Sequence, residues 1–340
     1  MKKIVALILG FIILSCGTNN HISENNETTE ITGEIAQKYA NSIIVSDLKT
    51  HLYSIASDEF EGRETGEPGQ KKAAEYIKTF YKKRNITSPL GDDDYFQEIP
   101  TAHLRSNLNP SENVLAFIKG TEKPDEILVI SAHYDHLGME NGEIYNGADD
   151  DGSGTVAVMA IAEAFKKAAE EGNRPKRSIL FLHVTGEEKG LLGSKYYTNF
   201  PVFPLVNTVA NLNIDMIGRV DDAHENNPDF VYLIGSDKLS TELHDLSEAM
   251  NEKFTKLKLD YKYDDDNDPN RFYYRSDHYN FAKNNIPIIF YFNGTHQDYH
   301  KPSDTPDKIN YELLQKRTQL IFYTAWEIAN RDKRVVVDKK

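Results

Sequence analysis

Short apolar runs rich in β-branched residues alternate along the chain with longer stretches in which apolar residues recur every three or four positions. Such runs are typical of buried strands, and the second spacing is typical of amphipathic helices. The pattern predicts six strands, at Asn113–Ile118, Ile127–Ala132, Ser178–Val184, Thr208–Ile214, Val231–Ile234 and Pro287–Phe292. It predicts five helices, at Ile35–Ala56, Gly69–Arg84, Thr155–Glu171, Leu239–Phe254 and Asp307–Arg331.

The alternation of strands and helices predicts an α/β fold, with a central, mostly parallel sheet covered by helices on both faces. No linker-like composition interrupts residues 35–332, so we expect a single domain there, followed by a polar tail at residues 333–340. Two irregular stretches, Gly218–Asn226 and Lys258–Tyr274, are expected to form a rim over a site at the sheet edge.

The first residues predict export. Lys2 and Lys3 precede the apolar run Ile4–Leu14, which is too short to span a bilayer, so residues 1–15 are interpreted as a signal peptide. Cys16 follows at the position where bacterial lipoprotein signals are cleaved and lipidated, which these residues resemble. We therefore expect a lipid anchor on Cys16 and a location in the bacterial cell envelope. The alternative is an ordinary secretory signal with an incidental cysteine, which predicts a secreted protein.

Residues 16–34 are polar and read as a flexible tether behind the lipidated cysteine. The 340-residue chain has 39 Lys and Arg against 53 Asp and Glu, a net charge of −14. Such an acidic chain repels phosphate backbones, so no nucleic-acid partner is expected. One cysteine allows no internal disulfide and no thiolate cluster, so any metal site must use His, Asp and Glu.

Five motifs of metal-binding residue types lie in the segments that follow predicted strands. In open α/β sheets ligands bind beyond the carboxyl ends of strands, so these positions are candidates for one shared site. The candidate side chains, in chain order, belong to His133 with Asp135, Asp149 to Asp151, Glu187 with Glu188, Asp215, and Tyr299 with His300. One such motif arises easily by chance, and the acidic run at 149–151 also fits a solvated turn capped by Ser153. Five in succession favour a common metal centre.

In combination these motifs strongly resemble the di-zinc aminopeptidase family that includes bacterial leucyl aminopeptidase and aminopeptidase Y. The resemblance covers roughly residues 47–332 and adds Asp58 to Arg63 and Gly66 to Gly69 near its start. The motifs that carry it are His-x-Asp, Asp-Asp-Gly-Ser-Gly, Gly-Glu-Glu-x-Gly-Leu-Leu-Gly-Ser, Asn-x-Asp-Met-Ile-Gly and Tyr-His-x-Pro-x-Asp-Thr. It implies a sheet of about eight strands and a hydrolase acting on peptides with a free N-terminus. The oligomeric state is left open, with a monomer favoured.

The resemblance also implies a site for two Zn²⁺ ions, one or both of which another divalent metal can replace. His133 and Asp215 would hold one ion, Glu188 and His300 the other, and Asp150 would bridge them. Glu187 would be the general base. These nitrogen and oxygen ligands suit zinc.

Three further implications concern the surroundings of the metals. Asp135 would orient His133 through the second ring nitrogen. The Tyr299 hydroxyl would stabilise the developing oxyanion. The Asp150–Asp151 bond is a candidate for a cis peptide. Nearby His136, His183 and His296 match no ligand position of the family, and we interpret them as structural. For residues 275–278, a role in lining the substrate site and a purely structural role are equally open.

Other functions remain open. Glutaminyl cyclase shares the fold with a single zinc, but the Gly190-Leu191-Leu192-Gly193-Ser194 continuation resembles the peptidases. Carboxypeptidases and acylases with a similar ligand order insert a dimerisation domain of about a hundred residues, for which Asp215 and His300 are too close. Non-catalytic relatives such as the transferrin receptor lose metal ligands, whereas all are present here.

Overall fold

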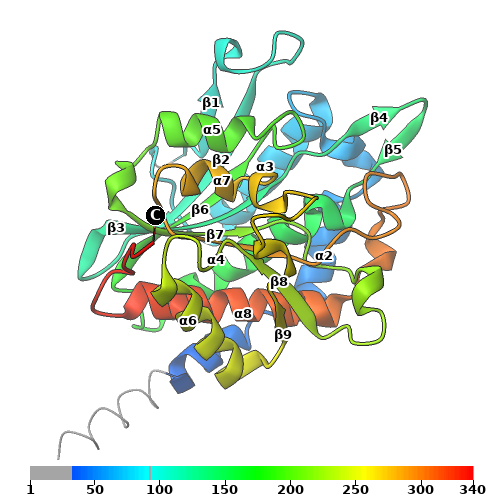
Figure 1. Cartoon of the computed structure of the whole chain (residues 1–340). Coiled ribbons are helices and arrows are strands. Elements are labelled where there is room, and N and C mark those ends of the chain that lie inside the picture. Colours follow the sequence, from blue (N-terminus) through cyan, green and yellow to red (C-terminus); the bar gives the residue numbers. More distant parts are fainter. Residues whose placement is uncertain (1–32, 92, 340) are drawn as a thin grey trace, which may run out of the picture.

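A computed structural model describes residues 33–91 and 93–339 of the chain. The predicted signal peptide, Cys16 and nearly all of the tether lie outside the described residues. An eight-stranded sheet runs through the centre of the molecule, in the order β1-β2-β6-β3-β7-β10-β8-β9 (Figure 1). Its strands are β1 (Phe96–Ile99), β2 (Ser111–Ile118), β3 (Lys123–His133), β6 (Arg177–Val184), β7 (Thr208–Ile214), β8 (Phe230–Ile234), β9 (Lys258–Asp260) and β10 (Ile288–Phe292).

The sheet is mixed, with a parallel centre. Strands β6, β3, β7 and β10 are parallel neighbours, whereas β1, β2 and β8 join by antiparallel pairing. The predicted α/β class, the mostly parallel centre and the count of eight strands are confirmed. All six predicted strands are present, and the two that the pattern missed, β1 and β9, are short edge strands. A separate hairpin pairs β4 (Gly138–Glu140) with β5 (Glu143–Tyr145).

Helices cover both faces of the sheet. One layer, which includes α4 and α8, packs on β3 and β6, while α5 and α7 pack on the opposite face (Figure 1). The α-helices are α2 (Val45–Ile55), α3 (Pro68–Lys83), α4 (Gly154–Glu170), α5 (Leu192–Asn199), α6 (Thr241–Met250), α7 (His278–Ala282) and α8 (Tyr311–Asn330). The single helix predicted at Ile35–Ala56 is instead two, because residues 41–44 leave the helical path between residues 33–40 and α2.

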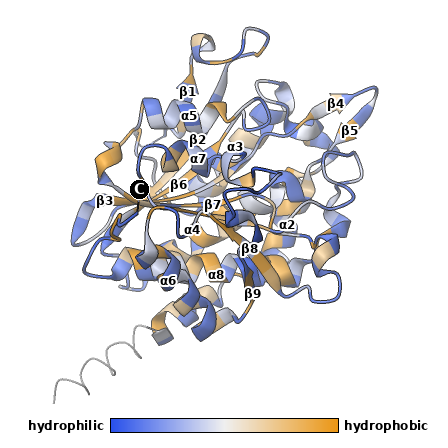
Figure 2. Cartoon of the chain, in the orientation of Figure 1, coloured by the Kyte–Doolittle hydropathy of each residue, from blue (hydrophilic) through white to orange (hydrophobic). Residues whose placement is uncertain are grey.

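The parallel strands are apolar along their whole length because they face a core on each side. In β3, Leu128 and Ile130 belong to the larger core under α4 and α8, whereas Ile127 and Val129 belong to the core under α5 and α7. Figure 2 shows the central strands largely in the hydrophobic colour. Burial on both faces therefore explains the continuous apolar runs, which lack a strict alternation.

The register of the central strands aligns their carboxyl ends. His133 at the end of β3 pairs with Val184 at the end of β6. Ala132 pairs with Ile214 at the end of β7, and Ile214 pairs with Tyr291 of β10. Residues that follow these four strands therefore emerge side by side at one edge of the sheet.

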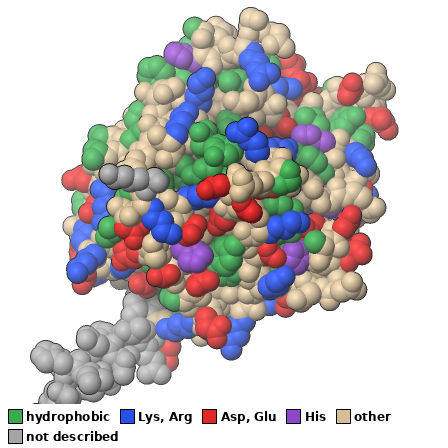
Figure 3. Space-filling model, viewed as in Figure 1, with side chains coloured by type: hydrophobic (Ala, Val, Ile, Leu, Met, Phe, Trp, Pro, Cys, Tyr) green, Lys and Arg blue, Asp and Glu red, His purple; other side chains and the backbone are tan. Residues whose placement is uncertain are grey.

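On the face shown in Figure 3, acidic side chains lie among those of Lys and Arg. None of the helices in the described part of the chain combines the length and apolar character needed to cross a bilayer.

Candidate active site

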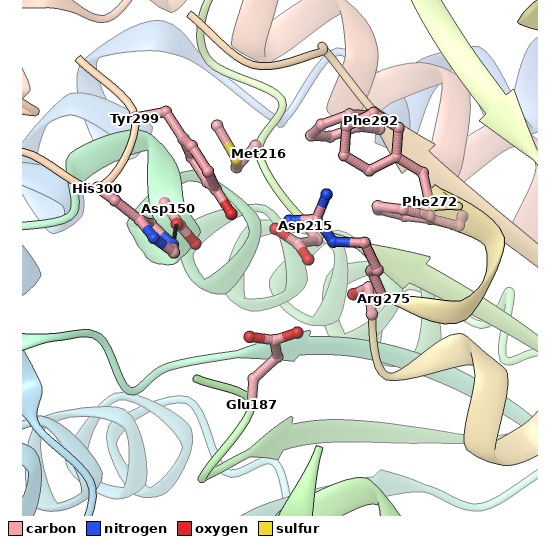
Figure 4. Close-up of a pocket in the computed structure, with 11 residues that line it drawn as sticks. Asp150, Glu187, Asp215, Met216, Phe272, Arg275, Phe292, Tyr299 and His300 are labelled. Carbon is pink, nitrogen blue, oxygen red and sulfur yellow. Dashed lines mark ion pairs between the residues drawn. The ribbon is translucent and has the colours of Figure 1, made fainter. Parts of the chain in front are cut away.

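The five candidate metal ligands and Glu187 meet at this carboxyl edge, beside one cavity. Asp150, Glu187, Asp215, Tyr299 and His300 line it. In Figure 4, Glu187 points into the cavity from one side, and Asp215 and Tyr299 approach from the other. The remaining wall is largely apolar, with Met216, Phe272, Phe290 and Phe292, and Arg275 lies at its exposed margin.

Asp150 lies in an irregular turn, Ala148–Ser153, that a buried carboxylate holds in place. Asp304 accepts hydrogen bonds from the backbone N–H groups of Asp149 and Asp150, at 3.0 and 3.2 Å to Oδ2. Burial raises the pKa of Asp304 to about 6. The Asp150–Asp151 peptide bond is cis, as the resemblance implies.

The two acids that flank Asp150 support the site through hydrogen bonds to backbone groups, and their carboxylates do not line the cavity. Asp149 Oδ1 accepts the N–H of Gly218 at 2.7 Å, and Asp151 Oδ1 accepts the N–H groups of Gly154 and Met216 at 2.8 and 3.0 Å. These bonds tie the turn to the start of α4 and to the loop after β7. All three acids are buried. The alternative of a solvated acidic turn is therefore wrong, and Ser153 forms no side-chain cap of α4.

A first group of donor atoms surrounds His133. Its Nε2 lies 3.3 Å from Asp150 Oδ1 and 3.5 Å from Asp215 Oδ1. The His133 side chain is almost completely buried, yet Nε2 has no hydrogen-bond partner among the described residues. Burial opposes protonation of this ring, but Asp215 and Asp150 outweigh it and raise the pKa of His133 well above its usual range.

A second group shares Asp150. His300 Nε2 lies 3.1 Å from Asp150 Oδ2 and 3.4 Å from Glu188 Oε2. His136 also belongs to this group, because its Nδ1 lies 3.0 Å from Glu188 Oε1 and 3.8 Å from Asp150 Oδ2. The structure thus brings His136, for which we expected a structural role, into contact with candidate ligands.

The two groups have the geometry of metal-ligand sets. Ligand atoms about 2.0–2.2 Å from one ion lie roughly 3–3.6 Å from each other. The closest distances within both groups are of this size, and the buried donors His133 Nε2 and Glu188 Oε1 have no hydrogen-bond partner among the described residues. Buried polar atoms without partners are costly unless a ligand satisfies them. The residues present therefore fit a pair of divalent cations bridged by Asp150.

Glu187 stands beside this pair, half-buried on the loop after β6. Burial raises the pKa of its carboxyl well above the usual range, and the nearby carboxylates Asp215 and Glu188 add to the shift. Its backbone N–H donates to Asp135 Oδ1 at 3.2 Å. A carboxylate whose pKa is raised by burial is a stronger proton acceptor than a free carboxylate, as a general base requires.

Asp135 contacts His133 differently from the expectation. The backbone carbonyl of Asp135 lies 3.1 Å from His133 Nδ1, whereas the nearest carboxylate oxygen is 3.8 Å away. The carboxylate instead accepts from the Thr65 hydroxyl at 2.7 Å and from the Glu187 backbone. Asp135 therefore connects His133, through its main chain, with the loop that carries Glu187.

Tyr299 stacks on the ring of His300, with 3.9 Å between the ring centroids. Burial raises the pKa of its hydroxyl, so Tyr299 remains a proton donor across the neutral range. His183 and His296 lie outside both donor groups. The hydroxyl of Tyr81 lies 2.7 Å from His183 Nε2, and His296 Nε2 lies 3.2 Å from Asp149 Oδ2.

Arg63, a residue for which no role was predicted, connects the segments behind the site. This fully buried side chain donates to the carbonyl oxygens of Ile55, Tyr134, Asn146 and Gly147 at 2.7–2.9 Å. It thus connects α2, the end of β3 and the turn that carries Asp150. The only signal in the sequence was its place in the Asp58-to-Arg63 motif, to which we had assigned no role.

The model of peptidase family M28 matches residues 113–325, which contain every candidate ligand and Glu187. The chain belongs to this family. Curated relatives match a shorter segment. A probable zinc metalloprotease of Leptosphaeria maculans is 34% identical over 109 residues, covering 31% of this chain and 24% of that protein. A probable glutamate carboxypeptidase of Arthroderma benhamiae is 34% identical over 114 residues, covering 33% of this chain and 15% of that protein. The matched segment thus spans less than a quarter of each relative.

Solved structures of aminopeptidases share the fold over most of the chain. The LapA aminopeptidase of Legionella pneumophila superposes with a TM-score of 0.68 at 21% identity, covering 88% of this chain and 76% of that one. A zinc aminopeptidase from Bacillus subtilis superposes with a TM-score of 0.63 at 17% identity, covering 86% of this chain and 97% of that one. The α/β architecture is therefore that of zinc exopeptidases.

Proposed function

We propose that the chain is a zinc-dependent aminopeptidase that hydrolyses the N-terminal bond of peptides. The observation that carries this proposal is the pair of donor groups that share Asp150 beside Glu187. Membership of a peptidase family supports hydrolysis of peptide bonds. Solved aminopeptidases with this fold support action at the amino end.

In this proposal His133 and Asp215 hold one zinc ion, Glu188 and His300 hold the other, and Asp150 holds both. Zinc bound there would supply the Lewis acidity that lowers the pKa of a water molecule and polarises a carbonyl group. The ligands are rigid because buried hydrogen bonds fix their backbones. Asp304 holds the Asp150 turn, and Asp151 holds the loop after Asp215.

Two side chains of the cavity then handle the proton and the developing charge. The Glu187 carboxylate takes a proton from the attacking water at one of its oxygens and returns it to the nitrogen of the leaving amine. The Tyr299 hydroxyl donates a hydrogen bond to the carbonyl oxygen as negative charge develops on it. Asp135 positions Glu187 by accepting its backbone N–H.

The apolar wall of the cavity supports a preference for substrates with an apolar N-terminal side chain. Met216, Phe272, Phe290 and Phe292 form a continuous surface beside Asp150 and Asp215. An apolar side chain that packs there brings its own amino group and carbonyl next to the candidate metal ligands. Each buried methylene contributes about 0.8 kcal/mol, so leucine or phenylalanine should be favoured over alanine.

The deciding experiment compares Glu187→Gln with the wild type. Loss of the base should reduce kcat by roughly 100- to 10,000-fold while both zinc ions remain, because Gln keeps the size of Glu without its basicity. Metal content and hydrolysis of leucyl peptides are measured together. Glu170→Gln, an exposed change on α4, is the control and should have no effect. Unchanged activity in Glu187→Gln would remove Glu187 as the base.

Substrate form separates the aminopeptidase from its alternatives. We expect free peptides to be cleaved and N-acetylated peptides to resist, with two zinc ions per chain. One zinc ion together with cyclisation of N-terminal glutamine would identify a glutaminyl cyclase. Release of residues from the carboxyl end of acetylated peptides would identify a carboxypeptidase.

We further propose a lipid anchor at Cys16 and a place in the bacterial cell envelope. The apolar run that ends at Leu14 and the position of the single cysteine support this assignment. Mass spectrometry of the N-terminal peptide should find a diacylglyceryl cysteine. Cys16→Ser should move the chain from the membrane fraction to the soluble fraction, and an unchanged distribution would refute the anchor.

A further inference from the structure

We infer that His136 is a protein ligand of the second metal ion, in addition to Asp150, Glu188 and His300. This inference rests on the proposed two-metal site and adds a ligand that the family resemblance does not supply. It makes the two metal positions unequal, with four protein ligands at one and three at the other.

The position of His136 supports a ligand role. Its side chain is completely buried, and neither ring nitrogen has a hydrogen-bond partner among the described residues. Nδ1 lies 3.0 Å from Glu188 Oε1, an atom that is itself without a hydrogen-bond partner there. Two buried polar atoms this close, and not aligned for a hydrogen bond, are arranged as neighbouring ligands of one cation are.

His136 also has the right relation to the other ligands of this ion. Its Nδ1 is 3.8 Å from Asp150 Oδ2, which in turn lies 3.1 Å from His300 Nε2. The rings of His136 and His300 meet edge to face, with 5.9 Å between centroids. His136, Asp150 and Glu188 offer ligand atoms that all lie within 4.8 Å of one another, and His300 joins this group through Asp150 and Glu188. A His₂ set with carboxylate oxygens is typical of zinc.

The backbone around His136 is shaped to admit the ring. Gly147 has φ of +52°, and a Cβ atom there would lie 2.5 Å from both Cγ and Cδ2 of His136. The His136 N–H donates to the Arg63 carbonyl at 3.1 Å, which fixes the main chain. The ring therefore occupies a slot that any side chain at position 147 would fill, and this slot directs Nδ1 towards Glu188.

The extra ligand gives the two ions different numbers of protein ligands and therefore different roles. Four protein ligands close a zinc site, whereas a catalytic site keeps a position open for water or substrate. The ion at His133 and Asp215, with three protein ligands, would then be the open one, and the ion at His136, with four, the closed and more tightly held one. Asp215 of the first group lines the cavity, and of the second group His300 does but His136 and Glu188 do not.

A direct test counts the histidine ligands. The chain is labelled with ¹⁵N-histidine, loaded with two equivalents of ¹¹³Cd²⁺, and examined for couplings between metal and ring nitrogen. Our inference requires three coupled histidines, and His136→Ala should remove one of them. Two coupled histidines with two bound ions would overturn the inference and leave the two-metal proposal intact. Failure of the wild type to bind two ions would overturn both.

Chelator competition with Zn²⁺ measures the energetic effect. His136→Ala should weaken the tighter ion by more than the roughly 100-fold that loss of an outer hydrogen-bond partner costs, and should leave the other affinity nearly unchanged. His136→Gln keeps an N–H donor near Glu188, so full recovery of affinity in this variant would show a hydrogen-bonding role and overturn the inference.

His183→Gln is the matched control, because His183 is equally buried but contacts Tyr81 outside the site. It should retain both ions and all three couplings. Circular dichroism of the metal-free variants shows whether each still folds. If His136→Ala does not fold, the cadmium couplings of the wild type still decide the question.

Discussion

Replacing Arg63 tests whether one buried cation holds the active-site edge together. Its guanidinium donates to four backbone carbonyls, in α2, after β3 and in the approach to the Asp150 turn. Burial lowers the pKa of Arg63 to about 10, so the group remains charged at neutral pH. Arg63→Ala removes all four hydrogen bonds and takes one partner from each carbonyl, of which Gly147 keeps another in the Gly152 N–H at 3.2 Å.

The size of the loss follows from these contacts. A hydrogen bond to a charged group contributes about 1.5–3 kcal/mol, so four bonds counted independently would give roughly 6–12 kcal/mol. That sum is too large because desolvation of the guanidinium offsets part of it. Leaving a buried acceptor without its partner costs about 1–3 kcal/mol, and several acceptors are affected together, so we expect a loss of about 3–5 kcal/mol. It is a large share of the roughly 5–15 kcal/mol by which domains are stable.

Urea unfolding of the metal-free chain, followed by circular dichroism, measures this loss without a contribution from bound ions. Arg174→Ala removes an exposed arginine and should change the free energy of unfolding by no more than about 0.5 kcal/mol. Arg63→Lys should recover only part of the loss, because an ammonium group cannot reach four acceptors in the same way. If the free energy of unfolding of Arg63→Ala lies within about 1 kcal/mol of the wild-type value, the side chain does not stabilise this edge as we infer.

Three further predictions address the metal pair, the hydroxyl donor and pH. Asp150→Ala should lose tight binding of both ions in a metal analysis, and an ion that stays with unchanged affinity would disprove the bridge. Tyr299→Phe should lower kcat roughly 100- to 1,000-fold with little change in KM, and an unchanged kcat would exclude the oxyanion role. Burial lowers the pKa of His183 to about 3, so the folded chain keeps this ring neutral while the unfolded chain protonates it below a pKa of about 6.5. The full stability is therefore present above pH 6.5, and the free energy of unfolding decreases as pH falls below that value. Between pH 7 and 5, urea unfolding of His183→Gln should therefore show about 2 kcal/mol less loss of stability than wild type, whereas equal losses would contradict a neutral buried histidine.

The sequence predicted the centre of the fold better than its margins. Strands such as β3 and β6 contact a core on both faces, so burial alone makes them continuous apolar runs. The edge strands β1 and β9 have only four and three residues, and no periodicity is visible over so short a length. The break before α2 was missed because Ile43 and Ile44 continue the apolar spacing of a helix across it.

The site was predictable where chemistry coincides with strand ends. His133, Glu188 and Asp215 each follow a central strand, and the register brings those ends together. His136 was missed because ligand positions were transferred by motif, and its approach to Glu188 depends on the slot beside Gly147. Arg63 and Asp304 act through backbone groups distant in sequence, which no local pattern reveals.

The proposed ligands come from five separate segments between His133 and His300, and this spread gives the ions a second effect. Each bound ion closes long loops of the chain, as a disulfide does, in a sequence whose single cysteine cannot form an internal one. Binding that favours the folded chain over the unfolded one increases stability in proportion to the logarithm of free ion concentration. Zinc supply would then set the stability of the folded chain as well as its catalytic rate.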